Sequence, residues 1–357
     1  MSNTRSTNVN GFHRIGVAAA ILAIAAQALV AQTPAEYQRA VNAAYEKYRN
    51  LEEGKNADYI PALAKVDPKT FGIALVTPDG KVYTAGDIGS EVSIQSVSKV
   101  FVMARVFQQS GEKAISDNVG VDATGQAFNS IVAVEQFKGK EMNALVNPGA
   151  ITATSLINGA NADEVWNTIL NTMSAFAGRP LVVNQEVYKS EAETNQRNQA
   201  IAMLMYAYGH IKANPLQATD LYTRQCAINV NARDLAVMAA TLANGGKNPV
   251  TGQQVLGAEH VAPTLAVMAT AGLYDDSGKW LFATGLPAKS GVGGGLIAVS
   301  PGKFGIAVVS PPLDAAGNSV RGQKAIADIS NALGGNPYIV SARDGRLSSR
   351  QSGENRK

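Results

Sequence analysis

The sequence carries its strand-forming runs near its two ends, with a long helical stretch between them. The first runs, 71–76 and 81–83, flank a Pro-Asp-Gly turn, which is typical of a hairpin. Two later runs, 287–299 and 304–310, are joined by a turn at 300–303. Because a sheet must bury its apolar face against other elements, we expect both ends to share one layer. The pattern predicts an α+β fold, an antiparallel sheet flanked by helices with an inserted, mainly helical domain.

Helices predicted at both ends complete that layer. Helix start signals and apolar spacing predict helices over 34–48 and 319–333. We therefore expect a discontinuous α/β domain, residues 32–110 plus 286–340, and a helical domain, residues 111–285. The clearest helical patterns inside the inserted part are 192–208 and 232–244.

The N-terminal residues 1–31 have the features of a signal peptide. A basic start precedes an apolar run over 15–30 and then small residues. This run is short for a membrane span, which needs about 20 apolar residues. We expect cleavage after Ala28 or Ala31, export to the periplasm or medium, and no stable membrane insertion of the mature chain; the alternative is an uncleaved anchor. The polar tail 341–357 is expected to be disordered.

Composition excludes several classes of site. The net charge of +3 over 357 residues, with scattered basic residues, does not indicate a nucleic-acid partner. Cys226 is the only cysteine, so neither an intramolecular disulfide nor a cysteine-based metal site is expected. A Ser-His-Asp triad would need His210 or His260, since His13 lies in the leader. We expect no metal and no cofactor.

The stretch 93–99 places a hydroxyl and an amine three residues apart at the head of a predicted helix. Residues three apart share a helix face, so Lys99 can reach Ser96 and take its proton. With Ser93 as N-cap, Ser96 would lie in the first turn, where free N–H groups favour developing negative charge. This arrangement suits a serine nucleophile activated by lysine. The alternative is a helix cap beside a solvated lysine.

Other short motifs lack this setting. Two further S-x-x-K matches are present, Ser110/Lys113 and Ser300/Lys303. The first pair lies at the end of a predicted helix and the second in a turn, so neither faces a pocket at a helix start. A possible S-D-N motif, 116–118, follows the same helix closely and is better explained as a polar turn.

A second candidate motif, Lys289-Ser290-Gly291, begins a late predicted strand and continues into a glycine-rich stretch, 292–295. A strand without side chains lets a substrate approach its backbone, and an N–H group there can complete an oxyanion hole. Taken alone, such glycines also indicate a bulge or bend. Combined with the earlier S-x-x-K, the motif matches the pairing of penicillin-binding proteins and β-lactamases. The two motifs predict serine acyl-enzyme chemistry.

Longer blocks point to one family. They stand in order along the chain: Ser93-Ile94-Gln95-Ser96-Val97-Ser98-Lys99-Val100-Phe101, Asn147-Pro148-Gly149-Ala150-Ile151, Ser190-Glu191 with Arg197-Asn198, Tyr222-Thr223-Arg224-Gln225-Cys226, Leu242-Ala243-Asn244-Gly245-Gly246 through Asn248-Pro249-Val250-Thr251-Gly252, and Gly285 through Gly295. With these blocks the chain resembles the serine-dependent glutaminase family, which has a β-lactamase-like fold and hydrolyses glutamine to glutamate and ammonia. The resemblance extends from about Tyr37 to Leu333.

The resemblance implies a catalytic role for several residues. Ser96 would be the nucleophile and Lys99 its base. The N–H groups of Ser96 and Val292 would face the tetrahedral oxyanion. Tyr274, near the nucleophile, would relay a proton to the leaving ammonia. Lys289 would give electrostatic support, and Ser96, Tyr274 and Val292 would also contact the substrate.

The resemblance also implies a binding site for a zwitterionic amino acid. Glu191 would pair with the substrate α-ammonium, while Tyr59, Asn147, Asn198 and Tyr222 would hydrogen-bond its head group and carboxylate. Glu191 and Asn198 are seven apart and would share a helix face if one helix extends that far. The local alternatives are a turn former for Asn147, a first-turn acid for Glu191, a solvated helix residue for Asn198, and core or rim aromatics for the tyrosines.

Two other functions compete with a glutaminase. A β-lactamase or penicillin-binding-like serine acyltransferase would have no use for Glu191, and a catalytically inactive binding protein would bind glutamine without turnover. L-Glutamine is the expected small-molecule partner, and we expect a homodimer or homotetramer.

Overall fold

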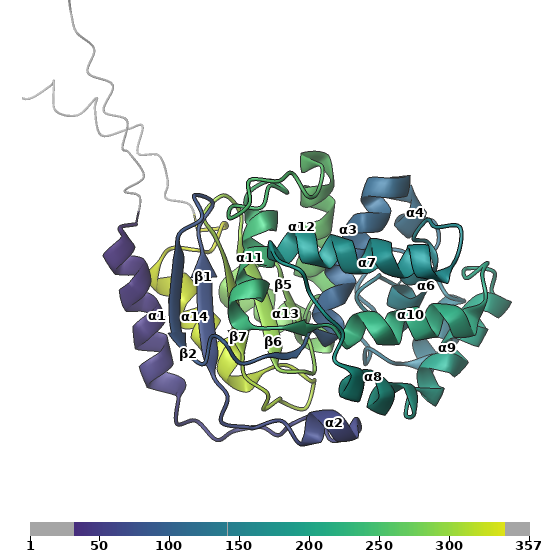
Figure 1. Cartoon of the computed structure of the whole chain (residues 1–357), viewed down its shortest axis with the longest axis horizontal. Coiled ribbons are helices and arrows are strands. Elements are labelled where there is room, and N and C mark those ends of the chain that lie inside the picture. Colours follow the sequence, from purple (N-terminus) through teal and green to yellow (C-terminus); the bar gives the residue numbers. More distant parts are fainter. Residues whose placement is uncertain (1–31, 141, 340–357) are drawn as a thin grey trace, which may run out of the picture. The chain divides into compact units, whose positions relative to one another are not determined.

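In the computed structural model, which describes residues 32–140 and 142–339, strands from both ends of the chain form one antiparallel sheet (Figure 1). The strand order is β2-β1-β7-β6-β5, and β1 lies directly beside β7. The predicted α+β class is therefore confirmed. The strands are β1 (Gly72–Val76), β2 (Val82–Gly86), β5 (Ala288–Ser290), β6 (Gly295–Ser300) and β7 (Phe304–Val309).

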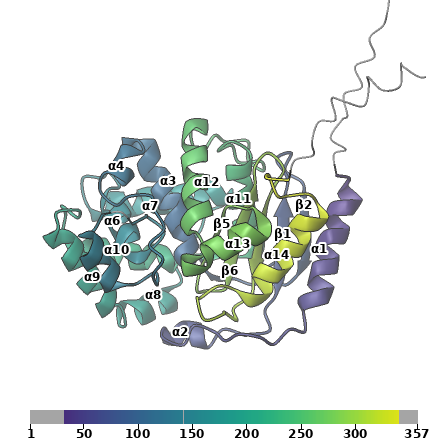
Figure 2. The same ribbon diagram turned by 180° about the vertical axis from the view of Figure 1, so that it is seen from behind.

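Helices cover both faces of this sheet. On one face lie α1 (Pro34–Tyr48) and α14 (Val320–Ala332), as Figure 2 shows, and on the other lies α11 (Ala232–Ala243). Alternate residues of β1 divide between the two faces, because successive strand side chains point in opposite directions. Ile73 and Leu75 pack into the cluster that contains α1 and α14, whereas the intervening Ala74 and Val76 join the cluster that contains α11.

Several predicted elements are present with small changes of boundary. Thr33 caps α1 through a capping box with Glu36, which explains why the helix begins at Pro34 as expected. The run predicted as one strand over 287–299 is two strands, because Gly294 adopts φ +94° in the turn between β5 and β6. The helix predicted over 192–208 starts later than expected, since α8 ends at Ala192 and α9 begins at Gln196.

The other helices gather largely at the end of the sheet opposite α1 (Figure 1). The domain boundaries predicted at 110 and 285 stay predictions, although α11, inside that range, packs against β1, β6 and β7. The remaining α-helices among the described residues are α2 (Pro61–Ala64), α3 (Ser98–Ser110), α4 (Lys113–Ser116), α5 (Ile131–Phe137), α6 (Asn147–Ser155), α7 (Ala162–Ala177), α8 (Gln185–Ala192), α9 (Gln196–Ala207), α10 (Pro215–Cys226), α12 (Val261–Ala271) and α13 (Ser277–Thr284).

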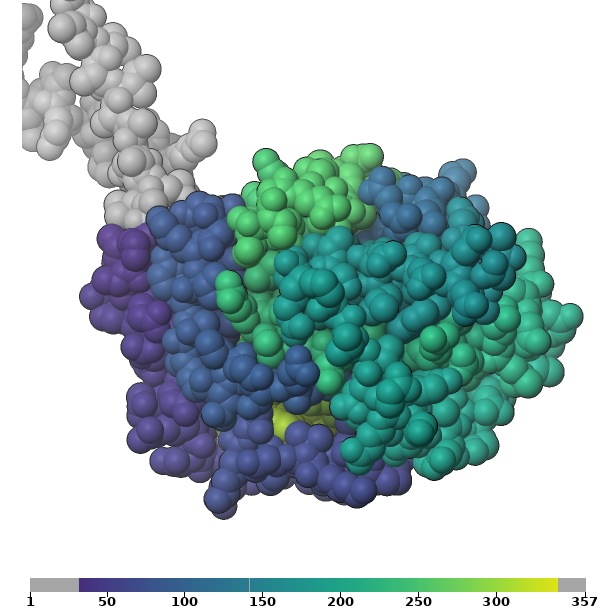
Figure 3. Space-filling model, in the orientation of Figure 1, coloured from purple at the N-terminus to yellow at the C-terminus, as the bar shows by residue number. Residues whose placement is uncertain are grey.

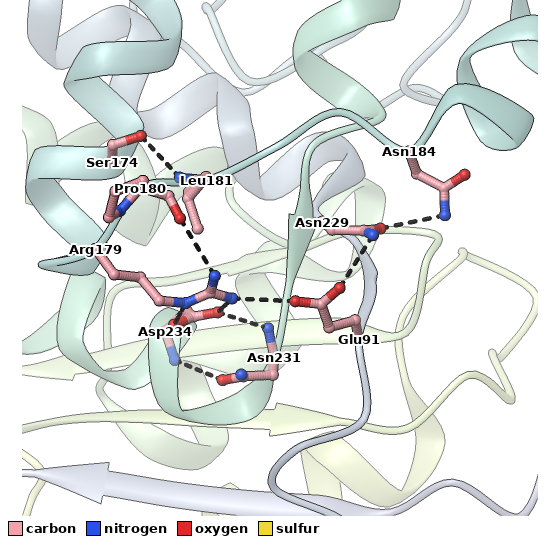
Figure 4. A network of polar contacts seen from close by, with 9 residues as sticks. All are labelled: Glu91, Ser174, Arg179, Pro180, Leu181, Asn184, Asn229, Asn231 and Asp234. Carbon is pink, nitrogen blue, oxygen red and sulfur yellow. Dashed lines mark hydrogen bonds and ion pairs between the residues drawn. The ribbon is translucent and has the colours of Figure 1, made fainter.

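A polar network braces a second, two-stranded sheet, β3 (Val92–Ser93) with β4 (Asn229–Val230) (Figure 4). The Arg179 guanidinium donates to both carboxylate oxygens of Asp234, at 2.7 and 2.6 Å, and to Glu91 at 3.2 Å. Glu91 also accepts from the Asn229 amide at 3.1 Å. The network joins the start of α11 to both short strands. Because β3 ends at Ser93, two residues before the turn that contains Ser96, we infer that this network restrains the backbone at Ser96.

None of the helices within the described residues is long and apolar enough to cross a membrane. Within the same residues, no three His, Cys, Asp or Glu side chains cluster as a metal site would require. The signal peptide predicted for 1–31 and the disordered tail predicted for 341–357 lie outside the residues that the structure describes.

Candidate active site

A cavity of about 270 Å³ is lined on one side by the backbone around Ser96 and the turn after β5, and on the other by residues of α6, α8, α9 and α10. Its volume is close to the lower end of the range for ligand pockets, roughly 300–1,000 Å³, which suits a small molecule. The space-filling view shows one face of the molecule hollowed between the blue N-terminal and teal central segments (Figure 3). The cavity is lined by Tyr59, Ile60, Gln95, Ser96, Phe128, Asn129, Asn147, Glu191, Thr194, Asn195, Arg197, Asn198, Tyr222 and Val292.

Ser96 lies in a 3₁₀ turn, η1 (Gln95–Val97), that runs straight into α3. Ser93 belongs to β3 and caps no helix, so the predicted N-cap is wrong. The turn requires Gln95 to adopt φ +48°, and Tyr274 has φ +57°. These are two of the three non-glycine residues with positive φ among those described, and each costs of order 1–3 kcal/mol. Tight packing must therefore hold the backbone on both sides of the site.

The glycine-rich turn after β5 lies against the backbone around Ser96. A Cβ atom on Gly291 would come within 2.8 Å of the Ile94 carbonyl oxygen and 3.3 Å of the Ser96 nitrogen. A Cβ atom on Gly293 would come within 2.3 Å of the Ser93 carbonyl oxygen. Only glycine allows this approach, which brings residue 292 to the same cavity wall as the hydroxyl of residue 96.

Lys99 is almost fully buried on α3, behind the cavity wall. Its ammonium donates a 2.7 Å hydrogen bond to Asn147 Oδ1 and lies 5.7 Å from the centre of the Tyr222 ring. Burial lowers the pKa of Lys99 to about 8, while Cys226 and Glu191 act in the opposite direction. At pH 7 about a tenth of the amine is therefore neutral and able to accept a proton.

Asn147, the first residue of α6, joins the predicted head-group residues into one network. Its Oδ1 accepts from Lys99 and, at 3.1 Å, from the Tyr222 hydroxyl. Its Nδ2 donates to Asn198 Oδ1 at 2.9 Å. The amide is thus held by three helices, α3, α9 and α10, and lines the cavity with a fixed orientation.

Glu191 lies in the last turn of α8 with only 6% of its surface exposed. Burial raises the pKa of Glu191 to about 7, while a hydrogen bond from Gln95 and the charge of Lys99 lower it. Asn198 reaches the same cavity from α9, so the single helix that a shared face would require is absent between these two residues. Tyr59 is 53% exposed and lines the cavity mouth.

Tyr274 and Lys289 lie behind the cavity lining. The Tyr274 hydroxyl donates to the Ser290 carbonyl at 3.1 Å, and burial raises the pKa of Tyr274 while a hydrogen bond with Ser96 opposes the rise. The Lys289 amine donates to the Ser290 carbonyl at 2.6 Å and lies 4.0 Å from the centre of the Tyr274 ring. Burial and the charge of Lys99 lower the pKa of Lys289 well below its usual value, which disfavours the charge that electrostatic support requires.

Sequence reasoning missed several lining residues. Gln95 could have been found from its place beside Ser96. Arg197 belongs to the family-like block with Asn198, and its Nε donates to the Asn129 carbonyl at 2.9 Å. Phe128 gave no sequence signal, because its ring reaches the site from a loop and packs 4.8 Å from the Tyr274 ring.

The chain is similar to known proteins over most of its length. The family model described as Glutaminase matches residues 54–338. A glutaminase of Colwellia psychrerythraea is 51% identical over 84% of this chain and 97% of its own length, and one of Mycobacterium ulcerans is 49% identical over 84% and 93%. A solved structure of the probable glutaminase ybaS is 46% identical, with a TM-score of 0.85 over 87% of this chain and 100% of that one.

Proposed function

Because this chain belongs to the glutaminase family, we propose that it hydrolyses L-glutamine through an acyl-enzyme formed on Ser96. Membership of this family supports the reaction, the hydrolysis of glutamine to glutamate by an enzyme that acts on a linear amide C–N bond. One observation supports the mechanism most: Ser96, Val292 and Glu191 line a single cavity. The site thus offers a nucleophile, a backbone donor and a counter-ion for an amino acid.

In the proposed acylation, the neutral amine of Lys99 takes the proton of the Ser96 hydroxyl as its oxygen attacks the side-chain amide carbon of glutamine. The C–N bond then breaks, and the departing nitrogen takes the proton that Lys99 accepted, relayed by a neighbouring hydroxyl, and leaves as ammonia; Lys99 is then neutral again. We assign this relay to Tyr274, because its buried hydroxyl donates to the Ser290 carbonyl behind the cavity lining and its pKa responds to Ser96. In deacylation, Lys99 takes a proton from water, hydroxide attacks the ester, and Ser96 regains its proton as glutamate leaves.

The tetrahedral intermediate needs donors at its oxygen, and removing one such donor costs about 2.7–4 kcal/mol in related chemistry. We assign the backbone N–H groups of Ser96 and Val292 to this role. The support is the close packing of Gly291 on the Ser96 nitrogen, because it holds the two backbone segments at one cavity wall.

The cavity polarity fits a zwitterion. Glu191 provides the negative group for the α-ammonium, and the hydroxyls and amides of Tyr59, Asn147, Asn198 and Tyr222 provide hydrogen-bonding groups for the head group and carboxylate. A solved structure of Mglu, 36% identical with a TM-score of 0.81, is described in its glutamate form, which supports an amino-acid site in this fold.

Ammonia release from glutamine and asparagine, measured in parallel with hydrolysis of a chromogenic β-lactam, tests the function. We expect ammonia from glutamine and no β-lactam turnover. Rapid β-lactam hydrolysis without glutaminase activity would restore the acyltransferase alternative, and glutamine binding without ammonia release would support an inactive binding protein.

Changing Glu191 to glutamine should weaken substrate binding more than it slows chemistry. A hydrogen-bonded charge contributes about 1.5–3 kcal/mol, so we expect the dissociation constant for L-glutamine to rise about tenfold to a hundredfold. Calorimetric titration of a Ser96→Ala background measures this without turnover. Glu186→Gln, on the outer surface of the same helix and 3.9 Å from Lys65, is the matched control. Unchanged affinity in Glu191→Gln would remove the assignment.

We further propose that the mature chain is exported and assembles as a homodimer or homotetramer. The basic and apolar pattern of residues 1–31 supports export. After expression of the full chain, mass spectrometry should find a mature N-terminus at residue 29 or 32. Light scattering of the mature protein should give a molar mass of two or four chains. An intact residue 1 in the membrane fraction would favour the uncleaved anchor, and a single chain mass would contradict the assembly.

A further inference from the structure

The residue before the proposed nucleophile makes a contact that the mechanism above does not use. Gln95 is 3% exposed, and its Nε2 donates at 3.2 Å to Glu191 Oε2 and at 3.2 Å to Ser93 Oγ. We propose that Gln95 is a positioning residue that holds the Glu191 carboxylate, ionised, toward the cavity. This inference rests on the proposed role of Glu191 in binding the substrate α-ammonium.

The backbone at Gln95 is fixed in a conformation that side chains rarely adopt. Its φ of +48° lies in the left-handed region. A Cβ atom on Gly293 would come within 3.3 Å of Gln95 Cγ, so the glycine turn presses closely on the stem of this side chain. Such strain persists only where the surroundings over-determine it, and it concentrates at functional sites. One strained residue thus places the Ser96 hydroxyl and the amide that holds Glu191.

A neutral amide has a chemical advantage at this position. It stabilises the ionised carboxylate by donating a hydrogen bond, yet it brings no positive charge of its own. An arginine or lysine there would be a permanent counter-ion and would compete with the ammonium of the substrate. With Gln95, the charge of Glu191 stays available to the ligand.

The other groups around Glu191 fit this interpretation. Lys99 is the positively charged group that acts on Glu191, and its ammonium is already bonded to Asn147. The titratable groups on which Glu191 acts are Tyr59, Lys99, Tyr222 and Cys226. Charged groups on the helices packed against α8 engage other partners: Lys65 with Glu186, Asp220 with Tyr188, and Arg224 with the Trp166 ring.

The test is the pH dependence of glutamine binding in Gln95→Met, measured by calorimetry in the Ser96→Ala background. Loss of the donor should raise the pKa of Glu191 from about 7 to about 8 or above. The dissociation constant at pH 7 should then rise at least about fivefold, because the ionised share falls from about a half to about a tenth. The ratio of the dissociation constant of the variant to that of the parent should shrink at least about fourfold by pH 8.5. At that pH, Glu191 is ionised in nearly all of the parent and in much of the variant. Titration of the substrate amine cancels in this ratio.

Gln225→Met is the matched control, because Gln225 is another fully buried amide with two side-chain hydrogen bonds, to Ser98 and Thr154. It should leave the pH dependence of binding unchanged. If Gln95→Met does not fold, Gln95→Gly adopts the same φ without strain and carries the same prediction. A ratio of one at pH 7, or a raised ratio that stays constant with pH, would overturn the proposal.

The Glu191 and Gln95 variants distinguish a wrong binding role for Glu191 from a wrong positioning role for Gln95. If Glu191→Gln binds glutamine normally, the role proposed for Glu191 is wrong, and this inference falls with it. If Glu191→Gln weakens binding while Gln95→Met does not, the binding site stands and only the positioning role of Gln95 is lost.

Discussion

Replacing Ser96 with alanine is expected to abolish glutaminase activity while the protein stays folded. Removal of a serine nucleophile lowers kcat by roughly 10⁴- to 10⁶-fold, since the residual rate comes from binding and oxyanion stabilisation alone. The removed hydroxyl is small and lies at a cavity wall, so packing changes little. Ammonia release under saturating glutamine measures the loss, and circular dichroism verifies the fold.

Ser110→Ala is the matched control for that variant. Ser110 begins another S-x-x-K match, but it lies at the last position of α3, away from the cavity lining. It should retain full activity. Retention of even a tenth of the activity in Ser96→Ala would show that another group attacks the amide.

The second large effect is expected at Lys99. Truncation to alanine should lower kcat by a hundredfold to ten-thousandfold, about 3–5 kcal/mol of transition-state stabilisation, because a positioned base contributes that much. Lys113→Ala, from the same unused motif as Ser110, should have no such effect. A drop in kcat smaller than tenfold in Lys99→Ala would assign the base role elsewhere.

The pH profile of the parent enzyme tests the same residue. Burial lowers the pKa of Lys99 to about 8, so the amine is charged and inactive as a base at lower pH and becomes neutral as pH rises through about 8. We therefore expect kcat to increase tenfold per pH unit well below that value and to level off above it. A kcat that stays flat between pH 6 and 9 would contradict the assignment.

Local sequence signals predicted the layer that supports the site. The cap at Thr33 and the Pro-Asp-Gly turn after β1 act within a few residues, so their effect is visible in the sequence. The sharing of one sheet by β1 and β7 followed from the need to bury both strands, and the register with Gly72 opposite Val309 agrees with it.

The sequence did not predict the geometry inside the cavity. The break between α8 and α9 separates Glu191 from Asn198, and tertiary packing rather than helix propensity places both at the pocket. The positive φ at Gln95 and the hydrogen bond from Lys99 to Asn147 depend on segments distant in the chain. The sequence motifs predicted which residues form the site, whereas the orientation and protonation of their side chains depend on burial and on contacts between distant segments.

Covalent trapping tests the central claim most directly. A glutamine analogue with an electrophilic group in place of its side-chain amide should react at the nucleophile, and peptide mass spectrometry locates the modified residue. We predict modification of Ser96, no labelling in Ser96→Ala, and slower labelling in Glu191→Gln. Modification of any other residue in the parent enzyme, with Ser96 unlabelled, would contradict the account.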